Sequence, residues 1–378
     1  MRGKTIEHLK SNDSLVLLAK TFNLFSRNKK RDLSKTYIFT CQHILRPREK
    51  MFSLFVGFGI PKENIFILGK EYSTNVNLFA ELKNDNFNLY QPSFDTKKTF
   101  DEQHNENCNL LFKLFKETVF GESRVIILDD GAVLLSEFNK NFEKIDESIE
   151  ILGIEQTSSG FRKLENEILK FPIINVARSA IKLNKESPFI ADICIEKISD
   201  YISENNIINN KFLVVGLGPI GKALVNGLHK QGEKVSGFDD ALGHKNLMEK
   251  IIELKPNIII GATGIKAISE EYIEYLNSLN YPIYLVSVSS SDREFPVASY
   301  RKGISLNIHS DVIYGNIVFV NNGFPINFES SYYKGGVKRI ERTICLLLGS
   351  VLYLANRRET SSLSKGFIVV PEKITTLL

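Results

Sequence analysis

The chain has 378 residues, 43% of them hydrophobic, which is enough apolar material for a sizeable core and a length typical of two or three domains. The 48 Lys and Arg residues nearly balance the 44 Asp and Glu residues, which argues against a dedicated binder of nucleic acid or of an anionic membrane. The four cysteines stand apart with no CxxC pair, so they indicate reduced thiols in a cytoplasmic protein, without a disulfide framework or a metal site. The polar N-terminus and the lack of a long apolar run favour neither a secreted nor a membrane-spanning chain.

The first half of the chain has the pattern of an α/β domain. An amphipathic helix is expected over 15–25, ahead of a basic loop at 27–31 that we interpret as a solvated turn. Apolar runs without polar alternation, separated by stretches of helical length, indicate buried parallel strands. These runs lie at 37–40, 65–68 and 125–128. Asn, Lys and Asp are frequent over 75–109, which predicts an irregular surface excursion there.

A second α/β pattern begins at Lys211 and continues to Asn322. Its expected strands lie at 212–216, 234–238, 257–260, 283–288 and 316–320. A long apolar stretch over 342–356 predicts a helix that returns to the first domain.

The strongest local signal is a GxGxxG motif directly after an apolar strand and ahead of a helix. Gly216 permits a tight turn, Gly218 lets a pyrophosphate approach the backbone, and Gly221 lets the helix pack closely on the strand. Pro219 and Ile220 begin the helix, whose N-terminus attracts phosphate groups. The motif predicts a dinucleotide site.

An acidic residue indicates which dinucleotide binds. Asp239 ends the next strand, 23 positions after Gly216, where a carboxylate accepts a hydrogen bond from a ribose 2′-hydroxyl. It would repel a 2′-phosphate, so NAD is favoured over NADP. Polar or small residues after two later strands extend the predicted cofactor site; they are Ala262, Thr263, Gly264 and Ser289.

These patterns predict an α/β fold with two Rossmann-like domains. We expect a substrate domain over 1–185, an NAD-binding domain over 186–328, and a C-terminal helical segment over 329–378 that packs back on the substrate domain.

Further motifs occur in one order along most of 37–330. They are Cys41-Gln42-His43, Tyr72-Ser73-Thr74, Asp129-Asp130-Gly131, the run from Glu155 to Gly160, Asn175-Val176 with Ser179 and Lys182, and Ile326-Asn327. In residue type and spacing they resemble motifs of the S-adenosylhomocysteine hydrolase family. The family's bound NAD⁺ oxidises a substrate hydroxyl to a ketone, a base removes the acidified neighbouring proton, the 5′-substituent leaves, water adds, and the ketone is reduced again.

The resemblance implies roles for individual residues. Lys182 matches the lysine that handles the proton at the hydroxyl, and His43 with Asp130 matches the pair that handles protons at the departing end. Gln156 and Glu186 match two further catalytic positions, each with a changed side chain. The cofactor contacts implied are those of Thr157, Ser158 and Ser159 with the nicotinamide ribose or carboxamide, and of Asn327 with the carboxamide.

Each of these groups also has a purely structural interpretation. His43 alone suits a satisfied core histidine, and the two aspartates suit a strand-end turn. The cluster 157–159 suits a helix cap, and Lys182 with Glu186 suits a surface ion pair.

The departures from the family suggest a different substrate. Ser290 stands where the family has a late histidine, and the family's C-terminal Lys/Tyr tail is absent. Arg46, Arg48 and Arg178 stand at or near positions that are neutral or acidic in the family. Our hypothesis is that the substrate carries a phosphate or carboxylate group.

Four functions remain open. The first is a divergent NAD-dependent enzyme acting on a sugar or nucleoside hydroxyl, and the second is a true S-adenosylhomocysteine hydrolase. The third is an NAD-binding pseudoenzyme, and the fourth is a 2-hydroxyacid dehydrogenase, for which only His309 lies late enough. The expected partner is a small molecule, not nucleic acid or membrane, and the resemblance suggests a homo-oligomer.

Overall fold

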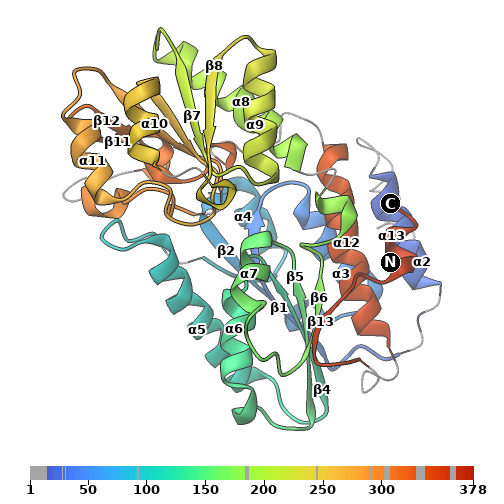
Figure 1. Cartoon of the computed structure of the whole chain (residues 1–378). Helices are drawn as coiled ribbons and strands as arrows, with labels where there is room; N and C mark the ends of the chain where they lie inside the picture. The colour runs from blue at the N-terminus through green and yellow to red at the C-terminus, as the bar shows by residue number, and fades with distance from the viewer. Residues whose placement is uncertain are drawn as a thin grey trace. The chain divides into compact units, whose positions relative to one another are not determined.

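The chain folds into two compact units, shown in Figure 1. The computed structural model describes residues 15–27, 29, 31–91, 93–183, 187–243, 246–289, 291–301, 307–328, 337–357 and 363–378. Unit 1 comprises Met1–Pro92, His104–Glu186 and Ser331–Leu378, and unit 2 comprises Ser93–Gln103 and Ser187–Ser330.

Unit 1 is built on a seven-stranded parallel sheet. In the order in which they lie side by side, its strands are β13 (Gly366–Ile368), β6 (Pro172–Asn175), β5 (Ile149–Glu155), β4 (Ser123–Asp129), β1 (Thr36–Ile44), β2 (Ile65–Thr74) and β3 (Asn88–Tyr90). Helices cover both faces, so the central strands are buried almost throughout and read as apolar runs. The strand order reverses between β1 and β4.

Two apolar clusters hold helices on the two faces of this sheet. One face packs against α2 (Val16–Ser26), α3 (Arg48–Phe58), α4 (Val76–Asn84), α12 (Val337–Asn356) and α13 (Glu372–Thr375). The other packs against α5 (Phe100–Thr118), α6 (Val133–Lys140) and α7 (Ser158–Leu164).

Unit 2 has a six-stranded sheet that is parallel except for one edge strand. Its strands lie in the order β11 (Val312–Tyr314), β12 (Ile317–Phe319), β10 (Ile283–Ser287), β9 (Ile258–Gly261), β7 (Lys211–Val215) and β8 (Lys234–Phe238). One face packs against α8 (Ser187–Glu204) and α9 (Pro219–Lys230), the other against α10 (Leu247–Leu254) and α11 (Glu270–Asn277). Here the order reverses between β7 and β9.

These two sheets confirm the predicted fold class of two Rossmann-like α/β domains. The expected surface excursion over 75–109 is wrong, because the segment contains α4, β3 and the start of α5. Asn75 caps α4 by accepting a hydrogen bond from the Leu78 N–H at 2.8 Å. The frequent polar residues lie on exposed faces, while Leu78 and Leu82 are buried.

Residues 93–103, which fall inside the expected range of the substrate domain, belong to unit 2. A buried ion pair inside that unit binds them. Arg301 Nη2 lies 2.7 Å from Asp292 Oδ2, and Asp292 accepts a hydrogen bond from the Phe100 N–H at 3.2 Å. None of the described helices has the length and apolar character needed to cross a bilayer.

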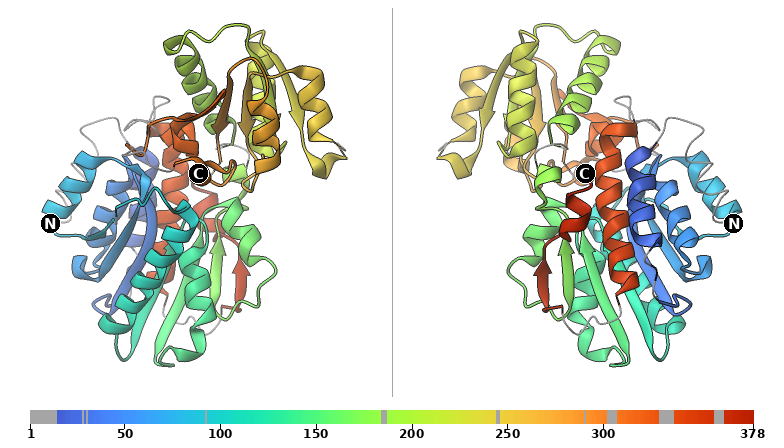
Figure 2. Two further views of the ribbon diagram at one scale, coloured as in Figure 1. Left: turned by 90° about the vertical axis from the view of Figure 1, so that its left-hand side faces the viewer. Right: turned by 90° about the vertical axis from the view of Figure 1, so that its right-hand side faces the viewer.

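The long C-terminal helix α12 belongs to unit 1, where it lies beside α2 and α3 in both views of Figure 2. Its last turn is held by a buried cation, Arg124 at the start of β4, whose Nη1 donates to the carbonyls of Leu354, Ala355 and Arg357 at 2.8–2.9 Å. Arg124 Nε also donates to Glu150 at 2.5 Å. The guanidinium therefore supplies the partners that carbonyls at a helix C-terminus lack.

Replacing this guanidinium is expected to destabilise unit 1. Arg124→Met leaves three carbonyls without their donor, and it should lower the free energy of unfolding by about 2–4 kcal/mol. Chemical denaturation of the full chain measures the change, with Arg162→Met as the control, because Arg162 is an exposed residue of α7. Equal stability of the two variants would contradict the role given to Arg124.

Candidate functional site

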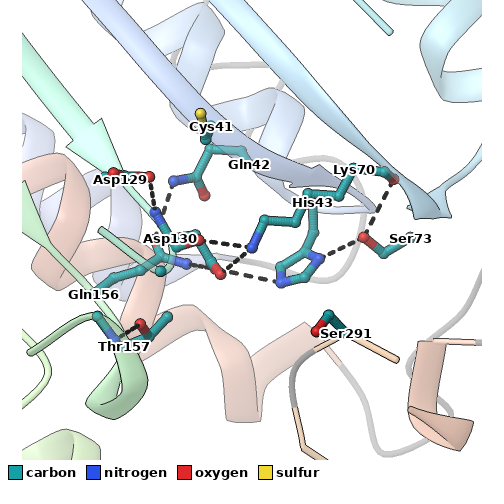
Figure 3. A network of polar contacts seen from close by, with 12 residues as sticks. Cys41, Gln42, His43, Lys70, Ser73, Asp129, Asp130, Gln156, Thr157 and Ser291 are labelled. Carbon is teal, nitrogen blue, oxygen red and sulfur yellow. Dashed lines mark hydrogen bonds and ion pairs between the residues drawn. The ribbon is translucent and has the colours of Figure 1, made fainter. Parts of the chain in front are cut away.

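The predicted catalytic residues of unit 1 gather at the carboxyl ends of β1, β4 and β5 (Figure 3). This edge flanks the point where the strand order reverses, which is where open α/β sheets bind ligands. His43 lies near the end of β1, Asp130 directly follows β4, and Gln156 directly follows β5. The structure therefore brings together three of the five predicted catalytic residues.

Asp130 is the centre of this group. Its Oδ1 lies 2.5 Å from Lys70 Nζ, which also donates to the Asp130 carbonyl at 2.7 Å. Its Oδ2 lies 3.3 Å from His43 Nε2 and accepts a hydrogen bond from the Gln156 side-chain amide. These four side chains are each at most 5% exposed, so water does not screen their charges strongly.

A second ring of side chains orients the first. His43 Nδ1 lies 2.5 Å from Ser73 Oγ, and the Gln42 amide donates to Gln156 Oε1 at 3.2 Å. Arg48 in turn donates to Gln42 Oε1. With Asp130 ionised, this network is satisfied when His43 carries its proton on Nε2 and accepts from the Ser73 hydroxyl on Nδ1.

The charges in this cluster follow from burial and from one ion pair. Burial alone would raise the pKa of Asp130, but the Lys70 ammonium, with His43 and Arg48, outweighs it and holds that pKa well below its usual range. Burial would lower the pKa of Lys70, but Asp130 outweighs it and raises that pKa. Burial lowers the pKa of His43 to about 4, against the attraction of Asp130. At neutral pH the cluster therefore holds a carboxylate, an ammonium and a neutral imidazole.

Two more carboxyl groups lie beneath this cluster. Asp129 accepts from the N–H groups of Asp130 and Leu135 at 2.8 and 2.9 Å, and so fixes the turn after β4. Burial, together with the charge of Asp129, raises the pKa of Glu155 to about 8. Glu155 accepts from the Thr157 N–H at 2.7 Å and from its hydroxyl at 2.6 Å.

The cluster 157–159 forms a helix cap. Thr157 Oγ1 accepts from the Gly160 N–H at 2.9 Å at the N-terminus of α7, while Ser158 and Ser159 make its first turn. The contacts of Thr157, Ser158 and Ser159 with a cofactor stay a prediction.

The predicted proton carrier at the hydroxyl, Lys182, is half-buried in a short helical turn after β6. Its backbone N–H donates to Ser179 Oγ at 3.3 Å. Its role stays a prediction. Glu186, the remaining predicted catalytic residue, and Ser290 lie outside the described residues.

The three arginines behind the anion hypothesis have different surroundings. Arg46 pairs with Glu49 at 3.2 Å and with Glu81 at 2.6 Å, so its charge is already balanced. Arg178 lies over the Phe161 ring, 4.4 Å from its centroid. Arg48 is 5% exposed, and its Nε has no hydrogen-bond partner among the described residues.

In unit 2 the glycine motif has the geometry that a dinucleotide loop requires. Gly216 has φ +99°, and a Cβ there would lie 2.7 Å from the Ala262 backbone. A Cβ at Gly221 would lie 1.8 Å from the Gly216 carbonyl oxygen. Gly218, by contrast, faces open space, and it precedes the first turn of α9 formed by Pro219 and Ile220. Two glycines thus permit close packing, and the third leaves room in front of a helix N-terminus.

Two carboxylates fix the loops around this helix N-terminus. Asp239 Oδ2 accepts from the Leu217 N–H at 2.6 Å and Oδ1 from the Ala241 N–H at 2.9 Å. Glu294 accepts from the Thr263 and Gly264 N–H groups at 3.0 and 2.7 Å. It also accepts from the hydroxyls of Thr263, at 2.7 Å, and of Ser289. The predicted cofactor residues after β9 and β10 are therefore preorganised by Glu294.

Asn327 has an unsatisfied buried atom. It lies in a short 3₁₀ turn, η7 (Ile326–Phe328), is 8% exposed, and its Oδ1 has no hydrogen-bond partner among the described residues. A buried carbonyl oxygen without a donor costs about 1–3 kcal/mol, which a ligand amide would recover.

Sequence reasoning missed Lys70 and Glu294. Lys70 lies inside a strand that is otherwise mostly apolar, and Glu294 lies within a polar loop of unremarkable composition. A buried strand containing a lysine is itself a signal, because a buried ammonium needs a carboxylate partner.

The comparisons with known proteins show relatives but no family. No family model matches the chain. Two curated proteins of Mycobacterium tuberculosis, the uncharacterized proteins MT0113 (strain CDC 1551 / Oshkosh) and Rv0104 (strain ATCC 25618 / H37Rv), are each 31% identical to it over 343 residues. The match covers 85% of this chain, which spans 65% of the length of those relatives.

Among solved structures, a dipicolinate synthase polypeptide from Bacillus halodurans is similar over 86% of this chain and 99% of its own, with a TM-score of 0.38 and 8% identity. This likeness is too weak to say anything of function. The resemblance to S-adenosylhomocysteine hydrolases stays a prediction.

The neutral state of His43 predicts a pH dependence of stability. Its folded pKa of about 4 lies below its usual 6.5, so on acidification the unfolded chain takes up the proton first. The stabilisation is complete above pH 6.5 and falls by about 3 kcal/mol as the pH drops to 4. Unfolding free energies of the wild type should therefore decline more steeply in this range than those of His43→Gln. His229→Gln, at an exposed position of α9, is the control and should follow the wild type. Parallel curves for wild type and His43→Gln would contradict the neutral imidazole.

Proposed function

We propose that this chain is an NAD-dependent enzyme, similar to but divergent from S-adenosylhomocysteine hydrolase, that oxidises a secondary hydroxyl of a nucleoside-like or sugar-like substrate. The proposal rests above all on the glycine loop of unit 2, where Gly216 and Gly221 are tightly packed and Gly218 faces open space. A loop built only for packing would have no reason to leave its middle glycine uncovered.

The residues of unit 2 fit the cofactor. The free N–H groups at the start of α9 would hold the pyrophosphate beside Gly218. Asp239 keeps lone pairs beyond its two backbone bonds and would accept from the adenine ribose. Asn327 Oδ1 would accept from the carboxamide. When bound, NAD would supply a hydride acceptor for the alcohol carbon.

The residues of unit 1 suit proton transfer at a substrate carbon and oxygen. At neutral pH the carboxylate of Asp130 and the neutral His43 are both able to accept a proton. The Lys70 ammonium stabilises negative charge next to them. Protonating Asp130 would leave Lys70 with a weakened partner, so His43 is the better proton acceptor of the two. Lys182 would take the proton of the hydroxyl that is oxidised.

Divergence from S-adenosylhomocysteine hydrolase follows from the polar groups around Asp130. Gln156 is an amide where the family has a carboxylate, and its amide N–H donates to Asp130 rather than competing for a proton. Arg48 adds a buried guanidinium with no carboxylate partner among the described ion pairs. We propose that it faces an anionic group of the substrate, because a buried cation without a counter-ion is costly.

The first experiment replaces the uncovered glycine. Gly218→Ala adds a Cβ that meets nothing in the protein at φ −66°, so the melting temperature of the full chain should stay within about 2 °C of wild type. The same methyl occupies the place of the pyrophosphate, so calorimetry should show NAD affinity reduced at least about tenfold.

Gly221→Ala is the contrasting variant, because its Cβ would clash with the Gly216 carbonyl, and it should lower the melting temperature. Unchanged NAD binding by Gly218→Ala, or no binding by the wild type, would refute the cofactor site.

The second experiment tests the anionic group. Phosphorylated nucleosides and sugars should raise the melting temperature of wild type more than their unphosphorylated forms do. Arg48→Met should lose this difference, corresponding to at least about tenfold weaker binding. Arg178→Met, which removes a cation that stacks on Phe161, should keep it. If Arg48→Met responds as wild type does, the anion is not bound there.

A further inference from the structure

Three soft or borderline ligand groups meet in the core of unit 1, although the sequence predicts no metal site. Cys41 lies on β1, and His104 and Cys108 lie one turn apart on α5. Cys41 Sγ is 3.6 Å from Cys108 Sγ, which is 3.8 Å from His104 Nε2. The three ligand atoms all lie within 4.8 Å of one another, and all three side chains are at most 3% exposed.

These separations suit a single metal ion. Metal–sulfur bonds of about 2.3 Å and metal–nitrogen bonds of about 2.0–2.1 Å place neighbouring ligand atoms roughly 3.5–4 Å apart. The i, i+4 spacing of His104 and Cys108 aims both side chains at the same side of α5, toward β1. Small adjustments of rotamer would therefore close the three ligands on an ion between them.

We propose that Cys41, His104 and Cys108 form a three-coordinate site for a monovalent copper ion. Thiolates select soft ions such as Cu(I) or Zn(II) over Mg²⁺ and Ca²⁺. Structural zinc takes four protein ligands, whereas no fourth imidazole, thiol or carboxylate joins this group within the described part of the chain. The inference is independent of the proposed function.

The surroundings of the site decide its charge. Cys41 and Cys108 belong to the apolar cluster between the sheet and α5, with Phe39, Phe112 and Phe115. Burial is the largest cause that raises the pKa of both thiols, with Asp129 adding to it and Lys70 opposing it. Both thiols are thus protonated without metal. Binding one Cu⁺ then releases two protons and leaves a site of net charge −1 near the Lys70 ammonium.

An entry route lies beside the cluster. A groove of about 670 Å³ is lined in part by Leu68, Asn107 and Leu111. Leu68 is the register partner of Cys41 on β2, and Asn107 directly precedes Cys108 on α5. An ion carried to this groove has only these side chains to pass.

The test loads the full chain anaerobically with Cu(I) or with Zn(II), removes free metal by desalting, and measures bound metal by mass spectrometry. We expect one copper per chain in the wild type. Cys108→Ser and His104→Gln should each weaken copper binding at least about tenfold. Cys194→Ser is the matched control, since Cys194 is a buried free cysteine in unit 2, and it should bind copper as wild type does.

X-ray absorption of the copper-loaded wild type needs no variant and should show two sulfur neighbours and one nitrogen neighbour. No retained copper, copper retained equally by the folded Cys108→Ser and His104→Gln variants, or retention of zinc in place of copper would each overturn the proposal. Loss of two hydrogens from the wild type on mild peroxide treatment, without metal binding, would assign the pair to a disulfide instead and would overturn it as well.

Discussion

At the carboxyl edge of a parallel sheet, the point where the strand order reverses is the one place that crossover helices leave uncovered. Each unit of this chain has one such point, between β1 and β4 in unit 1 and between β7 and β9 in unit 2. Nearly all the polar groups of the candidate cofactor and proton-transfer sites lie at these two edges. Apolar packing on both sheet faces fixes the strands, and the strands fix the polar groups to within hydrogen-bond distance of one another.

The carboxylates at these edges serve first to organise the protein. Asp130 is paired with Lys70, Asp239 holds the Leu217 N–H, and Glu294 gathers two backbone N–H groups and two hydroxyls. A buried carboxylate is stable only with such partners, and the partners become rigid in return. The loops that are proposed to meet cofactor and substrate are therefore held in place before any ligand binds. This preorganisation is what a hydride or proton transfer requires of its surroundings.

Local sequence patterns predicted the parts of the structure that depend on local physics. The strands β7 to β10 and the loop around Gly216 follow from apolar runs and glycine spacing, because burial on both faces and a tight turn impose those residue types. The edge strand β13 was not predicted, since three residues at Gly366–Ile368 carry little signal and pair only with the distant β6. The ion pair of Lys70 with Asp130 joins residues 60 positions apart, and the cluster of Cys41 with His104 and Cys108 joins residues up to 67 apart. Such contacts are set by strand order and register, which a single sequence does not display.

The proposed function depends on a nicotinamide dinucleotide at the carboxyl ends of β7 and β9, with Asp239 selecting its ribose. Native mass spectrometry of the full chain, exposed to equal concentrations of NAD and NADP, tests this most directly. The predicted result is one NAD bound per chain, in clear preference to NADP. A spectrum with no bound dinucleotide, or one in which NADP is bound as readily as NAD, would contradict it.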